Sequence, residues 1–303
     1  MGRAGFEIYA LSVRVSLSIT NVSWPDGTAT IAERLTATAR AAEDAGLDTL
    51  WVADHLLQSD PASRLDEPML EAYTTLGFLA GQTSRIRLGT LVAGATFRAP
   101  ALLVKEVTTL DVLSGGRAWL GIGAGYNEDE ARTMGIYLPP IGERFDIMAD
   151  TLEVARRMWA GDESPFHGRH EHLEHPIGSP RPLCQPRPPV LVGGTGERRT
   201  LRLVAEHADA CNLFDVPDRA RSVRRQLHVL ARHCADVGRP YEQIERTITT
   251  ALQPDEQVDP FIERCRELSE LGIQHVVVIT RGRPWTHDDV DVLGAAAAQL
   301  AEV

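Results

Sequence analysis

Residues Arg117–Glu130 read RAWLGIGAGYNEDE, an apolar strand that runs into glycines and then into an acidic, helix-opening segment. Glycine lets the backbone approach a flat or phosphorylated ligand and adopt positive φ at little steric cost, and a helix start leaves amide donors unpaired. The stretch therefore predicts a turn that holds a ligand. Its glycines are not specific by themselves, but the same arrangement recurs at residues 48–55, 86–94 and 189–196.

The chain has 303 residues, of which 43% are hydrophobic and 24% charged. This balance is ordinary for a globular protein with a sizeable core, and it excludes disordered and fibrous classes. Because α/β barrels reach this length as one unit, we expect a single domain over residues 12–303. The formal net charge is −11 and Lys105 is the only lysine, so we expect no nucleic-acid partner.

Four widely spaced cysteines form no Cys-x-x-Cys pair, so neither a zinc site nor a disulfide framework is predicted. The chain contains no run of about 18 apolar residues. Residues 1–11 lack the basic start and the long apolar core of a secretory signal. We therefore expect a cytoplasmic protein without a membrane partner.

Apolar runs of strand length alternate with amphipathic stretches of helix length along the chain, which predicts β-α units around a parallel sheet. The expected strands are Val13–Ile19, Thr49–Ala53, Ile86–Val92, Ala118–Ile122, Val190–Val192, Ala210–Leu213, Arg246–Ala251 and His275–Ile279. The helices expected between and after them include residues 28–45, 70–83, 100–113, 127–134, 143–160 and 288–301. Eight strands with eight helical crossovers match an α/β protein of the (β/α)8 TIM-barrel class. An open doubly wound sheet is the alternative.

Residues 161–188 break this rhythm after the fourth strand, because they are rich in proline and histidine and lack a helical period. We interpret them as an insertion on a loop that contributes to the substrate wall, together with residues 56–68. Within it, residues 166–175 look like a short hairpin with four histidines. Their spacing matches no helix-borne site such as His-Glu-x-x-His, so a solvated hairpin is favoured and no metal is predicted.

Residues just beyond the carboxyl ends of the strands form the active site of a parallel barrel. Asp54 and His55 follow the second strand, and an imidazole can donate or accept a proton near neutral pH. We predict that both are catalytic. The alternative is a histidine that only closes its loop through a hydrogen bond.

Glycines also follow the fifth strand, where Gly193–Gly196 precede the basic segment 197–202. Unpaired amides beside arginines meet the physical requirement for a phosphate on a small ligand. The arginines could equally form a solvated helix face. The chain has no Walker A loop and no dinucleotide fingerprint, which disfavours a nicotinamide-binding Rossmann domain.

Five segments in order resemble the luciferase-like monooxygenase superfamily, and within it the oxidoreductases that use the deazaflavin coenzyme F420. They are LWVADH (50–55), RLGTLV (87–92), GIGAGYNE (121–128), GERF (142–145) and VLVGGTG (190–196). The resemblance runs from about residue 13 to the C-terminus. It implies an enzyme that transfers a hydride between the deazaflavin and a small organic substrate, with His55 assisting proton movement.

The same resemblance implies that the strand ends hold the deazaflavin, with its phosphate near Gly193–Gly196 and the Tyr126–Asn127 turn. It also implies a non-proline cis peptide bond at Leu91–Val92, which supports the ring, and pairing of two barrels as a homodimer. The cofactor-binding residues expected are Ser18, Thr90, Leu91, Val92, Gly94, Gly125, Tyr126, Asn127, Gly193, Gly194, Thr195 and Gly196.

The chain departs from its relatives at two positions. Those that oxidise a sugar phosphate carry a tryptophan shortly after the Asp-His pair and a glutamate directly after the glycines of strand four, where this chain has Ser59 and Tyr126. Glucose 6-phosphate is therefore not the expected substrate. Two other functions stay open: an FMN-dependent luciferase-like monooxygenase, and a cofactor-free barrel without catalytic activity.

Overall fold

A computed structural model describes residues 12–216 and 218–301 of the chain. Residues 1–11, where the sequence predicts no secretory signal, lie outside the described residues. Each helix among the described residues is too short or too polar to span a bilayer.

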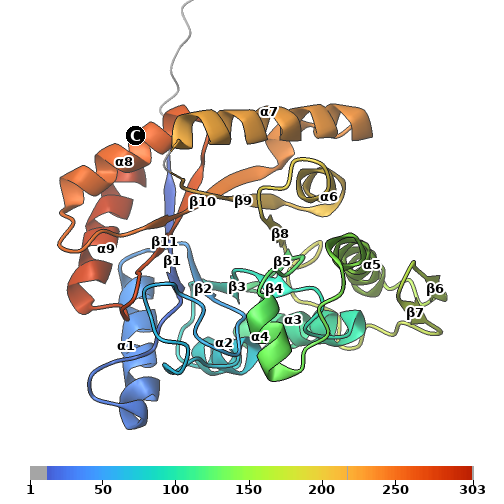
Figure 1. Cartoon of the computed structure of the whole chain (residues 1–303), viewed down its shortest axis with the longest axis horizontal. Helices are drawn as coiled ribbons and strands as arrows, with labels where there is room; N and C mark the ends of the chain where they lie inside the picture. The colour runs from blue at the N-terminus through green and yellow to red at the C-terminus, as the bar shows by residue number, and fades with distance from the viewer. Residues whose placement is uncertain (1–11, 217, 302–303) are drawn as a thin grey trace, which may run out of the picture.

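Eight parallel strands close into a barrel (Figure 1). They are β1 (Arg14–Ile19), β2 (Thr49–Val52), β3 (Arg87–Thr90), β5 (Ala118–Gly123), β8 (Val190–Gly193), β9 (Ala210–Phe214), β10 (Glu245–Ala251) and β11 (His275–Ile279). Pairing of β3 with β5 closes the ring, and the short strand β4 (Ala93–Gly94) extends that pairing on β5. The predicted TIM barrel is confirmed, and the open doubly wound sheet is wrong.

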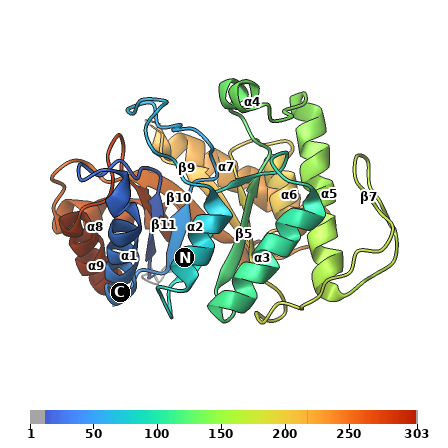
Figure 2. The ribbon, with the colours of Figure 1, turned by 90° about the horizontal axis from the view of Figure 1, so that it is seen from below.

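Helices connect successive strands and surround the barrel, as Figure 2 shows from the side. They are α1 (Ile31–Asp44), α2 (Ala72–Ala80), α3 (Pro100–Ser114), α4 (Glu128–Met134), α5 (Ile141–Ala160), α6 (Thr200–His207), α7 (Arg219–Val237), α8 (Val258–Glu270) and α9 (His287–Ala301). Single 3-10 turns occur at Thr28–Thr30 and Tyr241–Gln243. The short helix α4 stands above the carboxyl ends of the strands in Figure 2.

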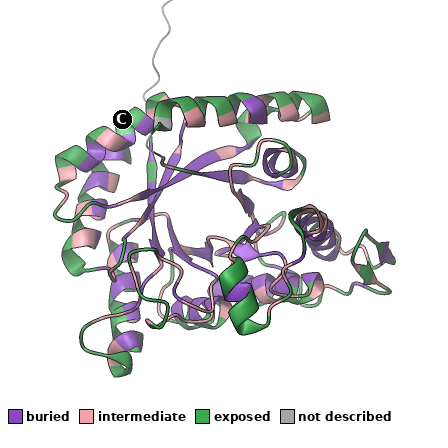
Figure 3. Ribbon diagram, in the orientation of Figure 1, coloured by how far each residue is buried: buried purple, intermediate pink, exposed green. Residues whose placement is uncertain are grey.

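The strands are buried on both faces, whereas the helices are exposed on their outer faces (Figure 3). The larger apolar cluster lies between strands and helices. A smaller cluster comprises Trp51, Trp119, Leu191, Ala210 and Val277, each from a different strand. Because side chains of a strand alternate between its faces, this second cluster fills the barrel interior.

The predicted strand 86–92 is shorter in the structure, because the chain bends between β3 and β4. The Leu91–Val92 peptide bond is cis, as the family resemblance implies. Glycines make room for this bend: a Cβ at Gly121 would collide with the carbonyl oxygen of Thr90, and one at Gly123 would lie 2.8 Å from Val92 Cγ2. The glycines of β5 thus serve close packing of the barrel wall.

Residues 161–188 pack along the outer flank of the barrel, beside α3 and α5. Asp111 on α3 accepts hydrogen bonds from the backbone amides of Leu183 and Cys184, and Asp150 on α5 accepts one from the amide of His170. The predicted hairpin is present as β6 (Phe166–His167) and β7 (His172–Leu173). None of its residues lines the cavity at the carboxyl ends of the strands, so its predicted place in the substrate wall is wrong.

Candidate functional site

A cavity of about 750 Å³ opens at the carboxyl ends of the strands. Leu91 and Val92, which rest on the interior cluster of the barrel, form part of its lining. Eleven of the predicted cofactor-binding residues line it, together with both predicted catalytic residues. They are Ser18, Leu91, Val92, Gly94, Gly125, Tyr126, Asn127, Gly193, Gly194, Thr195 and Gly196, with Asp54 and His55. The predicted wall after β2 contributes Ser59, Asp60 and Pro61.

Thr90 is the exception among the predicted cofactor-binding residues. It is fully buried and does not line the cavity; its hydroxyl donates a hydrogen bond to the carbonyl oxygen of Gly121 at 2.9 Å. This bond joins β3 to β5 inside the wall, because Thr90 is the last residue of β3 before the chain bends. Thr90 thus supports the wall of the cavity, and its predicted contact with the cofactor stays a prediction.

His55 pairs with Glu130, a residue that sequence reasoning missed. The distance from His55 Nδ1 to Glu130 Oε2 is 2.7 Å, and the side chain of Glu130 has no exposed surface while that of His55 is 16% exposed. Glu130 lies on α4, whose N-cap residue Asn127 accepts a hydrogen bond from the Glu130 amide at 3.1 Å. An Asn three residues before a Glu is a helix-capping pattern, and this pattern was the signal in the sequence that could have pointed to Glu130.

The environment of Glu130 favours its ionised form. Burial alone would raise the pKa of this carboxyl, but hydrogen bonds from His55 and from the amides of Leu57 and Leu56 together lower it. A buried carboxylate therefore lies behind the imidazole ring. It is the arrangement that orients a histidine in many acid–base sites.

Asp54 serves a different set of partners. Its two carboxylate oxygens accept hydrogen bonds from Arg98 at 2.7 and 3.0 Å, and Oδ2 also lies 3.3 Å from the backbone nitrogen of Gly94. Arg98 is shared with Glu71 and Glu106, which lie 2.6 and 2.9 Å away. Asp54 thereby holds β4 in place, and its predicted catalytic role stays a prediction.

Tyr126 stands at the cavity mouth. Its ring meets His55 edge to face at a centroid distance of 5.8 Å, its hydroxyl interacts with Ser59, and the residue is 70% exposed. The two positions where this chain departs from its sugar-phosphate relatives are therefore neighbours in space. Tyr126 lies against His55, and Ser59 lines the same cavity.

The glycine turn after β8 presents backbone to the cavity. Gly194 has a φ of +122°, and a Cβ at Gly196 would lie 2.7 Å from Thr200 Oγ1. Two of the arginines that follow have other partners: Arg199 donates to the carbonyl oxygen of Gly142, and Arg202 pairs with Glu206. The predicted phosphate contact stays a prediction, and Gly193–Gly196 line the cavity.

The residues present fit a flat, partly polar ring. Apolar side chains supply most of the cavity's surface near Leu91, Val92 and Ile279. Among the described residues, the buried hydroxyl of Ser18 has no hydrogen-bond partner although Ser18 lines this cavity. A buried polar atom without a partner costs about 1–3 kcal/mol, which a ligand atom can offset. No group of described side chains has the composition of a metal site.

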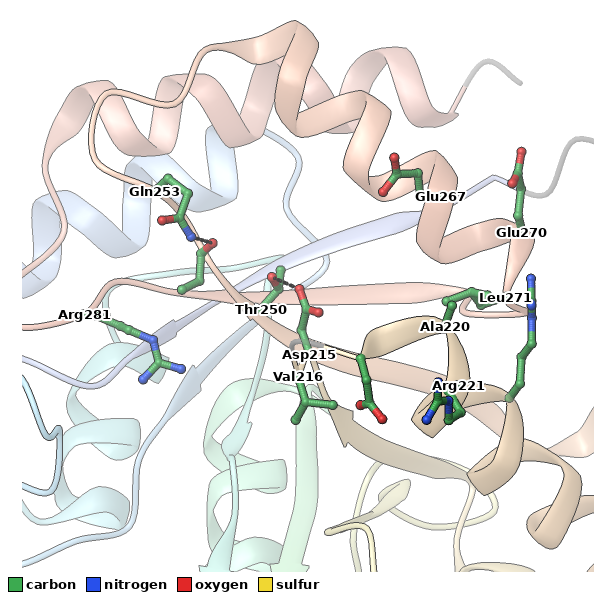
Figure 4. A pocket seen from close by; sticks show the side chains of 13 residues that line it. Asp215, Val216, Ala220, Arg221, Thr250, Gln253, Glu267, Glu270, Leu271 and Arg281 are labelled. Carbon is green, nitrogen blue, oxygen red and sulfur yellow. Dashed lines mark hydrogen bonds between the residues drawn. The ribbon is translucent and has the colours of Figure 1, made fainter.

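A second cavity of about 910 Å³ lies between α7 and α8 (Figure 4). It is lined by charged side chains of both signs, including Arg221, Arg224, Glu267 and Glu270, and Asp215 accepts a hydrogen bond from Thr250 at its edge. Its described lining residues include neither a histidine nor a glycine turn. The first cavity is therefore the better candidate for chemistry.

The chain is similar in sequence to several known proteins. It is 34% identical over 186 residues to an uncharacterized protein of Mycobacterium tuberculosis, an alignment that covers 57% of this chain and 64% of that protein. It is 30% identical over 234 residues to an F420-dependent glucose-6-phosphate dehydrogenase of Kineococcus radiotolerans, covering 77% of this chain and 67% of that enzyme.

The fold has a counterpart among solved structures. An F420-dependent secondary alcohol dehydrogenase in complex with an F420–acetone adduct superposes with a TM-score of 0.79 at 16% identity, over 94% of this chain and 99% of the other. At this identity the likeness shows the fold alone. The family model of luciferase-like monooxygenases, however, matches residues 13–269. The chain therefore belongs to the luciferase-like monooxygenase family.

Proposed function

We propose that this protein is an F420-dependent oxidoreductase that transfers a hydride between the deazaflavin and a small organic substrate. The observation that carries the proposal is the position of His55: a proton-transfer group lines the same cavity as the Leu91–Val92 bend. The name of the Kineococcus relative supports the choice of coenzyme.

In this proposal the chain binds and orients the cofactor at its apolar bend. Leu91, Val92 and Gly94 would support the ring, the Ser18 hydroxyl would meet a polar ring atom, and the amides of Gly193–Gly196 would meet the phosphate. When bound, the coenzyme supplies a ring carbon that accepts or releases a hydride. The surrounding apolar side chains exclude water from that carbon.

His55 would hold or release the proton of the substrate oxygen, because a neutral imidazole has one nitrogen that donates a proton and one that accepts it. Ser59 and Tyr126 stand at the mouth in place of the tryptophan and glutamate expected in sugar-phosphate enzymes. We therefore propose a substrate other than glucose 6-phosphate, although the Kineococcus relative is named for that sugar.

A binding comparison tests the proposal. Purified protein, stripped of any bound cofactor, is titrated with F420 and separately with FMN, and the change in cofactor fluorescence is recorded. We expect saturable binding of F420 and weaker or no binding of FMN. Tight FMN binding with no affinity for F420 would overturn the proposal and favour the second candidate, an FMN-dependent monooxygenase, which the description of the family supports.

A further inference from the structure

The two oxygens of the Glu130 carboxylate have separate partners. Oε2 lies 2.7 Å from His55 Nδ1, while Oε1 accepts hydrogen bonds from the backbone amides of Leu56 and Leu57 at 2.6 and 3.0 Å. We infer that Glu130 is a positioning residue, which keeps the proton of the neutral His55 ring on Nδ1 and leaves Nε2 as the proton acceptor that serves the cavity. The use of that acceptor on a substrate rests on the proposed function.

The tautomer follows from the chemistry of the pair. An ionised carboxylate has only acceptor oxygens, so the ring nitrogen at 2.7 Å must be the donor. The Glu130 side chain has no exposed surface and cannot turn to water instead. Because a neutral imidazole carries one proton, Nε2 is left with a free lone pair. Within the described residues, no side chain or backbone group hydrogen-bonds Nε2, so the lone pair is available to a ligand in the cavity.

The groups facing this pair do not compete for the proton. Tyr126, from the turn after β5, meets the ring edge to face and makes no hydrogen bond with it. Asp54, the neighbour of His55 in sequence, directs its carboxylate to Arg98 and to the amide of Gly94. Glu130 is thus the one described carboxylate that contacts the imidazole.

The second oxygen of Glu130 links the imidazole to the cavity wall. The amides of Leu56 and Leu57 begin the loop whose next residues, Ser59–Pro61, line the mouth. One carboxylate therefore orients the ring and holds the loop in place. The hydrogen bond from the Glu130 amide to the N-cap residue Asn127 fixes the direction in which the Glu130 carboxylate projects. The acidic residue directly before it, Asp129, is exposed to solvent and pairs with Arg132.

Glu130→Gln is the informative substitution because it separates the two tasks. The amide oxygen can still accept from the loop amides, but the NH₂ group then faces His55 Nδ1 and can only donate. The ring must respond by carrying its proton on Nε2. Asp129→Asn is the matched control, since it makes the same carboxylate-to-amide change on the same short helix at an exposed position.

The test reads the tautomer directly. Protein labelled with ¹⁵N in its histidine rings is examined by NMR without cofactor, at a pH where the imidazole is neutral, and His55 is assigned by comparison with His55→Ala. We expect the proton on Nδ1 in the natural protein and in Asp129→Asn, and on Nε2 in Glu130→Gln. A proton on Nε2 in the natural protein, protons on both nitrogens, or no change in Glu130→Gln would each overturn the inference.

Two further readouts separate this inference from a merely structural role and from the proposed function. Hydrogen exchange of the Leu56 and Leu57 amides is expected to stay slow in Glu130→Gln and to become fast in Glu130→Ala. If F420 is the cofactor, Glu130→Gln is expected to bind it unchanged but to turn over about 10²–10⁴-fold more slowly. A failure of F420 binding would remove the proposed function while leaving the NMR result to decide the tautomer.

Discussion

The barrel holds a histidine–glutamate pair at each end, and the two pairs differ in what surrounds them. His55 and Glu130 meet at the carboxyl ends of the strands, and His275 and Glu245 meet at the amino ends, each with 2.7 Å between Nδ1 and a carboxylate oxygen. The Nε2 atom of His275 is already occupied, because it lies 2.6 Å from Ser16 Oγ. The Nδ1–carboxylate distance is thus the same in the two pairs, whereas only the Nε2 atom of His55 is open to a ligand.

The lower pair shows why geometry alone does not identify a catalytic site. Ser16, His275 and Glu245 are in the order of contacts found in a hydrolase triad. Ser16 and His275 are nearly fully buried, however, and Ser16 Oγ also accepts a hydrogen bond from the amide of Thr49. Neither residue lines the cavities described above. The lower pair is therefore enclosed at the amino ends of the strands, whereas the upper pair lines the cavity at their carboxyl ends.

The largest expected effect comes from breaking the upper pair. We expect His55→Ala to lower the rate of F420 reduction about 10²–10⁴-fold, because a positioned proton-transfer group contributes about that much. Its stability in urea is expected to stay near that of the natural protein, since Glu130 keeps the amides of Leu56 and Leu57. Unchanged turnover would remove His55 from the mechanism.

Breaking the lower pair should act on stability instead. His275→Ala removes the hydrogen-bond partner of Glu245 and Ser16, while Arg14 still pairs with Glu245 at 2.6 Å, so we expect a loss of about 1–3 kcal/mol. Urea unfolding measures this loss, with His228→Ala on the exposed face of α7 as the control. A loss no larger than in the control would show that the lower pair does not hold the barrel together.

The lower end should also make stability depend on acid. Burial alone would raise the pKa of Asp48, but His275 and Arg87 outweigh it and lower that pKa from 3.8 to about 2. A lowered folded-state pKa stabilises the fold above pH 4, and this contribution, about 2 kcal/mol, is lost as the pH falls from about 4 to about 2. The free energy of unfolding, measured in urea, should change less with pH across this range in Asp48→Asn than in the natural protein. Identical slopes would contradict the assignment.

Much of the fold could be predicted because each strand is an apolar run bounded by turn residues. The end of the third strand could not, since the bend at Leu91–Val92 depends on space that Gly121, Gly123 and Gly193 leave on neighbouring strands. The insertion was misplaced for a simpler reason. A loop that follows a helix starts at the opposite end of the barrel from the active site, and residues 161–188 then run back along the outer side of α5, where Arg169 pairs with Asp146.

The candidate site was predicted where residues directly follow strands, because the carboxyl ends of parallel strands meet at one end of a barrel. It was missed where a partner comes from elsewhere. Glu130 is 75 residues from His55, and Arg98 is 44 residues from Asp54, so only the closed barrel brings each pair together. The homodimer, the cofactor contacts and the substrate class stay predictions.

The most direct test of the account asks which end of the barrel F420 protects. Hydrogen exchange followed by mass spectrometry is compared with and without the coenzyme. We expect slower exchange at residues 91–94, 123–127 and 193–196, and no change around the lower pair. Three results would contradict the claim that the upper cavity is the deazaflavin site: slower exchange only between α7 and α8, slower exchange only at the lower end of the barrel, or no change in exchange anywhere.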